Sequence, residues 1–186
     1  MKIAFIGTHG VGKSVLTYEL FSYLKKKGLD VNFVGEVSRD AFKRGLPINE
    51  NTHINAQGWI LLSQMAKEIE ADIDSKIVVC DRSVIDNYIY MKFRFGKIDF
   101  YERLVLDWLK ENSYDYLFKL PIVGGIMPDG VRAVDPSFQR MIDESLIKFL
   151  QDHSIEFYEL PAGGRDKWLE FVARVVLRQR SLSEWK

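Results

Sequence analysis

Hydrophobic residues fall into short runs that alternate with longer stretches in which they recur every three to four positions. The short runs predict buried strands, and the longer stretches predict amphipathic helices. The predicted strands cover residues 2–6, 31–34, 76–80, 114–120 and 156–160. The predicted helices cover about residues 13–27, 53–73, 84–93, 99–111, 136–152 and 166–181. Strands and helices therefore alternate along most of the chain.

This alternation predicts an α/β fold in which helices cover both faces of a five-stranded parallel sheet, with right-handed crossovers. In such sheets ligands bind beyond the carboxyl ends of the strands. A length of 186 residues, without repeats or low-complexity linkers, predicts a single domain over residues 1–186. Within it, residues 123–135 contain several Gly and Pro residues and are the segment expected to move.

Composition narrows the range of partners. Lys and Arg total 26 and Asp and Glu total 26, so no net charge attracts nucleic acid or an anionic membrane. Cys80 is the single cysteine, which excludes an intramolecular disulfide and suits a reducing cytoplasm. The apolar start of the chain is too short for a signal peptide or a membrane span. We therefore expect a cytoplasmic protein, and the sequence does not indicate its oligomeric state.

Residues 7–14 read Gly-Thr-His-Gly-Val-Gly-Lys-Ser and match G-x-x-x-x-G-K-[ST] between a predicted strand and a predicted helix. The glycines allow backbone N–H groups to point at phosphate oxygens, and the helix adds the positive end of its dipole. Lys13 can reach the β- and γ-phosphates, and the Ser14 hydroxyl is placed to bind Mg²⁺. The predicted nucleotide-binding residues are Gly7, Thr8, His9, Gly10, Val11, Gly12, Lys13, Ser14 and Val15. His9 occupies a variable position, so we expect a solvent-facing side chain.

The chain resembles P-loop kinase-like domains of the NadR type, best known as nicotinamide riboside kinases, and more distantly deoxynucleoside and thymidylate kinases. The segments GTHGVGKS, GEVSR, CDRS and PDGVR carry the resemblance, in this order over nearly the whole chain. It implies the three-layer P-loop NTPase fold, with ATP and Mg²⁺ as cofactors. Bifunctional NadR proteins also contain a nucleotidyltransferase domain, for which 186 residues leave no room, so that second activity is not expected.

Asp81 and Arg82 follow the third predicted strand and so emerge at the ligand end of the sheet. A carboxylate at this point can hold Mg²⁺ through its water shell, which makes Asp81 the candidate Walker B acid. Asp81 could instead cap the helix that follows. Arg82 resembles the arginine of the DR or ER motif that positions the acceptor in nucleoside and nucleotide kinases. The alternative for Arg82 is an ordinary surface arginine.

Glu36 and Arg39 follow the second predicted strand and emerge beside the same site. A carboxylate there could accept the proton of an acceptor hydroxyl. In the deoxynucleoside kinases that this segment resembles, a glutamate after the second strand does this work, so Glu36 rather than Asp81 is the candidate base. Glu36 could instead be an acid that complements a helix N-terminus. Gln57 and Trp59 lie in the region that faces the base in those kinases, although Trp59 is expected to pack in the core.

Residues 129–132, with Arg140 further on, resemble the lid of small-molecule kinases. There an arginine, here Arg132, closes over the transferring phosphoryl group and helps to exclude water. The lid is assigned to residues 123–135, and the alternative is an exposed loop that leads into an ordinary helix start at Asp135. Residues 161–164, after the last predicted strand, resemble the loop that contacts adenine.

These observations predict ATP- and Mg²⁺-dependent phosphoryl transfer to a small nucleoside, nucleotide or related metabolite. The rival is a regulatory NTPase or nucleotide-gated binding protein, which needs the P-loop and Asp81 but neither an acceptor pocket nor Glu36. Remodelling of nucleic acid is disfavoured by the neutral charge balance. The sequence separates ATP from GTP only through the resemblance to these kinases, since it contains no guanine-reading N-K-x-D motif.

Overall fold

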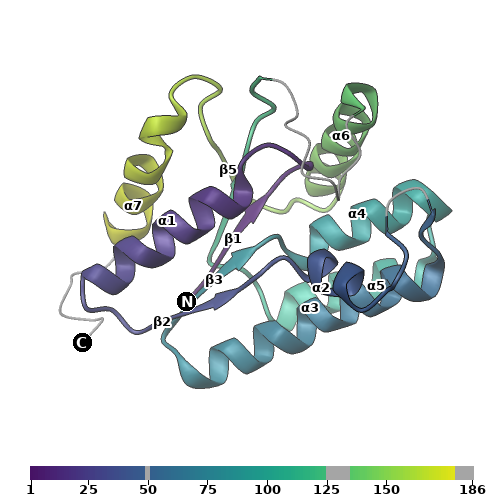
Figure 1. Cartoon of the computed structure of the whole chain (residues 1–186), viewed down its shortest axis with the longest axis horizontal. Coiled ribbons are helices and arrows are strands. Elements are labelled where there is room, and N and C mark those ends of the chain that lie inside the picture. Colours follow the sequence, from purple (N-terminus) through teal and green to yellow (C-terminus); the bar gives the residue numbers. More distant parts are fainter. Residues whose placement is uncertain (49–50, 125–134, 179–186) are drawn as a thin grey trace.

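The computed structural model describes residues 1–48, 51–124 and 135–178, and places a β-sheet between two layers of helices (Figure 1). The strands are β1 (Lys2–Ile6), β2 (Val31–Val34), β3 (Ile77–Asp81), β4 (Tyr116–Lys119) and β5 (Tyr158–Glu159). The helices are α1 (Lys13–Lys26), α2 (Val37–Lys43), α3 (Ile54–Asp74), α4 (Val84–Phe95), α5 (Asp99–Glu111), α6 (Pro136–Asp152) and α7 (Trp168–Arg178), with a 3-10 turn, η2 (Arg165–Lys167).

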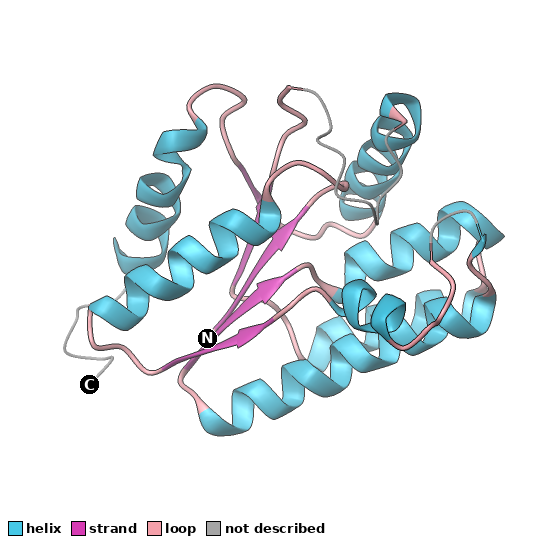
Figure 2. Cartoon of the chain, viewed as in Figure 1, coloured by secondary structure: helices cyan, strands magenta, loops and turns pink. Residues whose placement is uncertain are grey.

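The sheet has the strand order β2-β3-β1-β4-β5, and each neighbouring pair is parallel. Helices α1 and α7 cover one face, and α3, α4, α5 and α6 lie on the other side (Figure 2). Successive residues of a strand point to opposite faces, and β1 shows this directly. Ile3 and Phe5 pack in the core beneath α1 and α7, whereas Ala4 and Ile6 pack in the opposite core.

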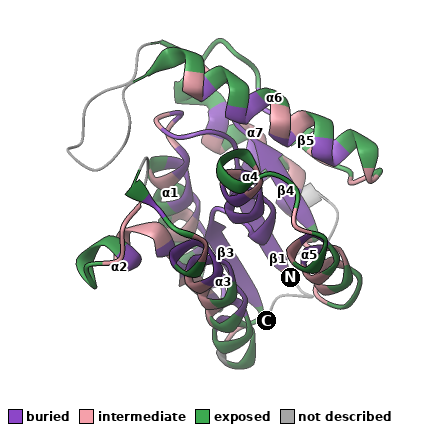
Figure 3. Cartoon of the chain, turned by 90° about the vertical axis from the view of Figure 1, so that its right-hand side faces the viewer, coloured by how far each residue is buried: buried purple, intermediate pink, exposed green. Residues whose placement is uncertain are grey.

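Burial on both faces explains why the strands appear in the sequence as continuous apolar runs. All five residues of β1 and all five of β3 are buried, and Figure 3 shows the sheet enclosed by helices whose outer surfaces are exposed. In the described part of the chain, no helix combines the length and apolar character that crossing a membrane requires.

The predicted three-layer fold with a five-stranded parallel sheet is confirmed. Two elements differ from the prediction. Helix α2, Val37–Lys43, was not predicted, and β5 is reduced to Tyr158–Glu159, two exposed residues at the sheet edge. The single-domain assignment stays a prediction. Most of the predicted lid, and the last residues of the predicted C-terminal helix, lie outside the described residues.

The parallel arrangement brings three connections to one edge of the sheet. The P-loop follows β1, Glu36 follows β2, and Asp81 ends β3 with Arg82 directly after it. Because β2, β3 and β1 are neighbours, segments that are far apart in the sequence converge beyond their carboxyl ends, where α/β sheets bind ligands.

Candidate active site

The loop between β1 and α1 has backbone conformations that favour glycine. The φ angles of Gly7, Gly10 and Gly12 are +141°, +75° and +101°, in a region that residues with a Cβ adopt only under strain. A Cβ on Gly7 would also lie 3.0 Å from the carbonyl oxygen of Leu120. The glycines of the motif therefore allow the loop to turn tightly while it packs against the end of β4.

Lys13 is buried, with 4% of its surface exposed, although it stands at the end of a loop. Its ammonium group donates to the carbonyl oxygens of Gly7 at 2.8 Å and Thr8 at 2.5 Å. Burial, reinforced by the positive charge of Arg82, lowers the pKa of Lys13 from 10.5 to about 7. The lysine is thus held inside the loop by weak acceptors, and phosphate oxygens would stabilise its charge better.

Asp81 is buried at the end of β3, and its Oδ1 has no hydrogen-bond partner among the described residues. Burial raises its pKa, although the hydrogen bond from Ser14 opposes this effect. A hydroxyl beside a carboxylate with a vacant oxygen is a donor set that fits Mg²⁺. No larger group of potential metal-binding side chains occurs among the described residues, and Mg²⁺ at a phosphate site commonly needs only one or two protein ligands.

The residue that caps α4 is Ser83, not Asp81. The Ser83 hydroxyl accepts from the backbone N–H groups of Ile85 and Asp86, and Asp86 accepts in return from the Ser83 backbone N–H at 2.9 Å. This is a reciprocal capping box. The alternative role for Asp81, as a helix cap, is therefore wrong, and its carboxylate is left for the phosphate site.

Glu36 and Arg82 form a buried ion pair across the ends of β2 and β3. The Glu36 Oε1 lies 3.0 Å from Nε and 2.9 Å from Nη2 of Arg82. Its other oxygen accepts from Nε of Arg39 at 3.0 Å, and Ser38 donates to Oε1 at 2.9 Å. Glu36 stands at the N-terminus of α2 but makes no side-chain cap hydrogen bond, so its carboxylate faces the two arginines rather than the helix backbone.

The interpretation of Arg82 as a surface arginine is wrong, since only 5% of it is exposed. Burial acts to lower its pKa, but the charges of Glu36 and other neighbours outweigh burial and raise it. The guanidinium carbon also lies 5.1 Å from the ring centre of Tyr90. Arg82 has a φ of +87°, which is strained for a side chain of this size. This backbone turn aims the guanidinium back towards β2.

His9 is buried, with 3% exposed, so our expectation of a solvent-facing side chain was also wrong. Its backbone N–H donates to the Tyr90 hydroxyl at 2.9 Å, and Gln139 donates to its carbonyl oxygen at 2.8 Å. The ring packs against Phe138, with the ring centres 5.3 Å apart. The middle of the P-loop is therefore clamped between α4 and α6, an arrangement that the motif does not encode.

Asp86 is a site residue that the sequence reasoning missed. Its Oδ1 accepts from the Gly7 backbone N–H at 3.0 Å, while Oδ2 accepts from Ser83. One carboxylate thus fastens the first glycine of the P-loop to the start of α4. The available signal was the spacing Ser-x-x-Asp in residues 83–86, which is typical of a capping box. That spacing does not indicate the contact with Gly7.

Gln57 and Trp59 lie on α3. The Gln57 side chain is buried and donates to the Thr52 hydroxyl at 2.9 Å. Trp59 is partly buried and packs with the cluster of Val37, Ala41 and Ile60, in line with the expected packing role. Contact of either side chain with a nucleobase stays a prediction.

The loop after β5 lies close to the P-loop, as the predicted adenine-contacting loop requires. The Trp168 indole N–H donates to the Pro161 carbonyl oxygen at 2.9 Å, and a Cβ added to Gly12 would lie 3.8 Å from the same indole ring. Arg165 stacks on that ring and donates to the Val123 carbonyl oxygen at 2.6 Å. Adenine binding by residues 161–164 stays a prediction.

The predicted lid is not covered by the structure. Arg132 lies outside the described residues, as do residues 125–134 in general. Asp135, where the description resumes, caps α6 by accepting from the Ser137 backbone N–H at 2.8 Å. Arg140 is exposed on α6. The helix start at Asp135 is therefore present, and closure by Arg132 stays a prediction.

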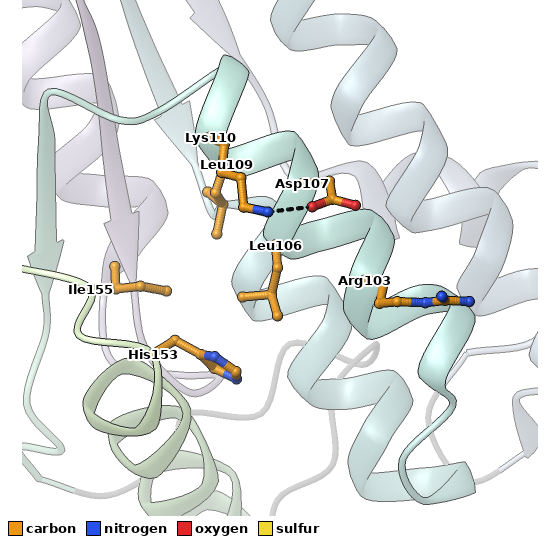
Figure 4. Close-up of a pocket in the computed structure, with 7 residues that line it drawn as sticks. All are labelled: Arg103, Leu106, Asp107, Leu109, Lys110, His153 and Ile155. Carbon is orange, nitrogen blue, oxygen red and sulfur yellow. Dashed lines mark hydrogen bonds and ion pairs between the residues drawn. The ribbon is translucent and has the colours of Figure 1, made fainter.

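A separate cavity of about 560 Å³ lies between α5 and the segment after α6 (Figure 4). It is lined by Arg103, Leu106, Asp107, Leu109, Lys110, His153 and Ile155. These residues precede β4 and β5 in the chain, so the cavity lies towards the end of the sheet opposite the P-loop. It contains none of the predicted catalytic residues and is not the phosphate site.

Comparisons relate the chain to a protein family, to two kinase sequences and to a solved structure. The profile of the family described as AAA domain (AAA_28) matches residues 2–167. Thymidylate kinases from two strains of Dehalococcoides mccartyi are 33% and 32% identical over 105 residues, which is 50% of this chain and 50% of each relative. The chain thus matches about half the length of these curated relatives.

A solved structure of deoxyadenosine kinase from M. mycoides, described with the products dCMP and a flexible dCDP bound, has a similar fold. Its TM-score is 0.64, and the match covers 95% of this chain and 98% of that chain at 16% identity. At this identity the likeness shows the fold alone.

Proposed function

This chain belongs to the AAA domain family, and on that premise we propose that it transfers the γ-phosphoryl group of ATP to a small acceptor. The acceptor class is a nucleoside, a nucleotide or a related metabolite, with nicotinamide riboside included because of the NadR-type resemblance. The similar proteins that are named as thymidylate kinases support a kinase-like enzyme of this class.

The observation that carries the proposal is the buried pair of Glu36 and Arg82 beside Lys13. A site that only binds or hydrolyses its nucleotide needs the P-loop, a magnesium ligand and a water. Such a site does not need a carboxylate that follows β2 and is held in place by two guanidinium groups. An acceptor hydroxyl uses both functions of this pair, since the carboxylate can take its proton and Arg82 can hold its position.

Each residue of the site has its own role in the proposed transfer. Lys13 leaves the carbonyl oxygens of its own loop and binds the β- and γ-phosphates. Ser14 and Asp81 would hold Mg²⁺, which would supply charge neutralisation on the transferring phosphoryl group. Glu36 accepts the proton from the acceptor hydroxyl while Arg82 orients the acceptor.

The proposal is tested by a phosphorylation screen of nucleosides, nucleotides and nicotinamide riboside with ATP and Mg²⁺. With the best acceptor, Glu36→Gln should lower kcat by about 10²- to 10⁴-fold, the usual scale of general-base catalysis, while ATP affinity stays close to that of the wild type. Asp40→Asn is the matched control. It makes the same change from acid to amide inside α2, the helix that Glu36 precedes, in a half-exposed carboxylate that pairs with Lys67, and should leave kcat unchanged.

The regulatory alternative predicts a different outcome. Under it, the wild-type protein binds ATP and Mg²⁺ but phosphorylates nothing in the screen, and Glu36→Gln behaves like Asp40→Asn. That pair of results would replace the kinase assignment by a nucleotide-gated binding protein.

A further inference from the structure

The short turn that leads from β3 into the first residue of α4, residues 82–84, is strained and must be held by its surroundings. Arg82 has a φ of +87°, a conformation that costs of the order of 1–3 kcal/mol and persists only when neighbouring contacts enforce it. The Arg82 N–H donates to the Phe5 carbonyl oxygen at 3.2 Å. The Val84 N–H, on the far side of the turn, donates to the Tyr114 hydroxyl at 3.0 Å.

The Tyr114 hydroxyl is itself fixed by a buried carboxylate. It donates to Oε1 of Glu68 at 2.6 Å, and because a hydroxyl has one proton, its lone pairs remain to face the Val84 N–H. Gln64 donates to the same Glu68 oxygen at 2.9 Å, and its amide nitrogen lies 3.5 Å from the Arg82 carbonyl oxygen. Two side chains that meet on Glu68 therefore contact both ends of the turn.

Glu68 and Gln64 lie on α3 and are completely buried. Burial raises the pKa of Glu68, while Lys2, whose ammonium lies 3.2 Å from Oε2, and the donors Tyr114 and Gln64 act against that rise. Replacing a buried polar network by apolar residues of the same shape is commonly neutral or stabilising. Fold stability alone therefore gives little reason for polar groups here, whereas control of the turn gives a specific one.

We propose that Gln64, Glu68 and Tyr114 form a brace that holds the turn at residues 82–84, and that Tyr114 and Glu68 are positioning residues for Arg82. This inference rests on the proposed kinase function, in which Arg82 contacts the acceptor. The brace fixes the turn in the backbone from which the guanidinium reaches Glu36. Lys2 compensates the charge of Glu68 at Oε2, whereas Tyr114 and Gln64 contact Oε1.

The first measurement follows the turn without any use of activity. Tyr114→Phe keeps the ring and removes the hydroxyl, so the Val84 N–H loses its acceptor. Amide hydrogen exchange at Val84 should then accelerate by about tenfold or more beyond the change in global exchange. Val79→Ala is the control, because it removes buried methyl groups from β3 on the opposite face of the sheet, in the core beneath α1 and α7, and it should change Val84 exchange only with global stability. Unaltered Val84 exchange in Tyr114→Phe would overturn the brace.

The second measurement tests positioning. With the best acceptor, Tyr114→Phe should lower kcat by about 10- to 100-fold, because a misplaced contact costs rate, while the KM for ATP stays unchanged. In an Arg82→Lys background the same change should cost no further rate, since both act through one contact. A loss in kcat no larger than that of Val79→Ala, or a full additional loss in the Arg82→Lys background, would refute the positioning role.

The two measurements distinguish a failure of this inference from a failure of the proposed function. A wild-type protein that phosphorylates no acceptor overturns the proposed function, and with it the catalytic part of the inference. Exchange at Val84 still decides whether the brace holds the turn. An active wild type in which Tyr114→Phe changes neither exchange nor kcat overturns the brace and leaves the kinase assignment intact.

Discussion

Lys13→Met tests whether the P-loop lysine takes up a proton when the nucleotide binds. In the structure the Lys13 ammonium is buried against the carbonyl oxygens of Gly7 and Thr8, and its pKa is lowered to about 7 by burial and by Arg82. Phosphate oxygens favour the charged form strongly. We therefore expect ATP binding to draw a proton onto Lys13 at any pH above that pKa.

The size of the effect follows from the pKa values. At pH 8 a group with a pKa of about 7 carries about 0.1 proton, and a lysine beside phosphates carries a full one, so binding takes up about 0.9 proton. At pH 6 the lysine is already charged and the uptake falls to about 0.1 proton. Above the pKa of about 7, and for as long as the nucleotide-bound lysine stays protonated, each rise of one pH unit should weaken ATP binding by about tenfold.

The same shift affects the stability of the nucleotide-free protein. Its folded-state pKa lies below the unfolded value of 10.5, so the unfolded chain binds more protons between pH 7 and 10.5. Stability therefore rises with pH over this window, by at most about 5 kcal/mol. Lys13→Met removes the buried ammonium, so at pH 7.5 the free energy of unfolding of the variant should exceed that of the wild type.

Titration calorimetry in buffers of different ionisation enthalpy measures the proton uptake directly. Phosphate groups with a pKa near 6 are mostly ionised at about pH 8, so the difference between wild type and Lys13→Met at that pH isolates the lysine. Equal proton uptake by the two proteins, or equal uptake by the wild type at acid and alkaline pH, would refute the reasoning. So would a variant that is less stable than the wild type.

Two further predictions concern the carboxylates of the site. Asp81→Asn removes charge but little volume, so Mg²⁺-dependent turnover should be lost while ATP affinity without Mg²⁺ changes much less; a normal rate and Mg²⁺ requirement in a metal titration would remove Asp81 from the metal site. Asp86→Asn leaves Gly7 or Ser83 without its charged acceptor, so urea denaturation should show a loss of about 1–3 kcal/mol together with weaker ATP binding. Unchanged ATP affinity in Asp86→Asn would show that the contact with Gly7 does not shape the P-loop.

The sheet and most helices could be predicted because burial of both faces leaves a strong record in the sequence. Strand β1 is an uninterrupted apolar run after Lys2, and α3 is long enough to show its period several times. Helix α2 was missed because its buried positions are only Val37 and Ala41, too few to define a period. Edge strand β5 is short and exposed, so the apolar residues around it overstate its length.

For the site residues, too, the outcome depends on whether their role follows from a contiguous motif or from tertiary contacts. The P-loop is a contiguous motif whose spacing suggests a role for each residue, so roles for Lys13 and Ser14 could be proposed without a structure. The partner of Glu36 could not be, because its contact with Arg82 depends on β2 lying beside β3. His9 was misjudged since its burial depends on Gln139, 130 residues away in the chain.

The central claim is that the γ-phosphoryl group passes to an acceptor molecule rather than to water. The most direct measurement follows ADP, inorganic phosphate and phosphorylated acceptor together during turnover of the wild-type protein with its best acceptor, ATP and Mg²⁺. The account predicts that ADP and phosphorylated acceptor form in equal amounts, with little inorganic phosphate. Inorganic phosphate that matches ADP throughout, with no phosphorylated acceptor from any compound in the screen, would contradict it.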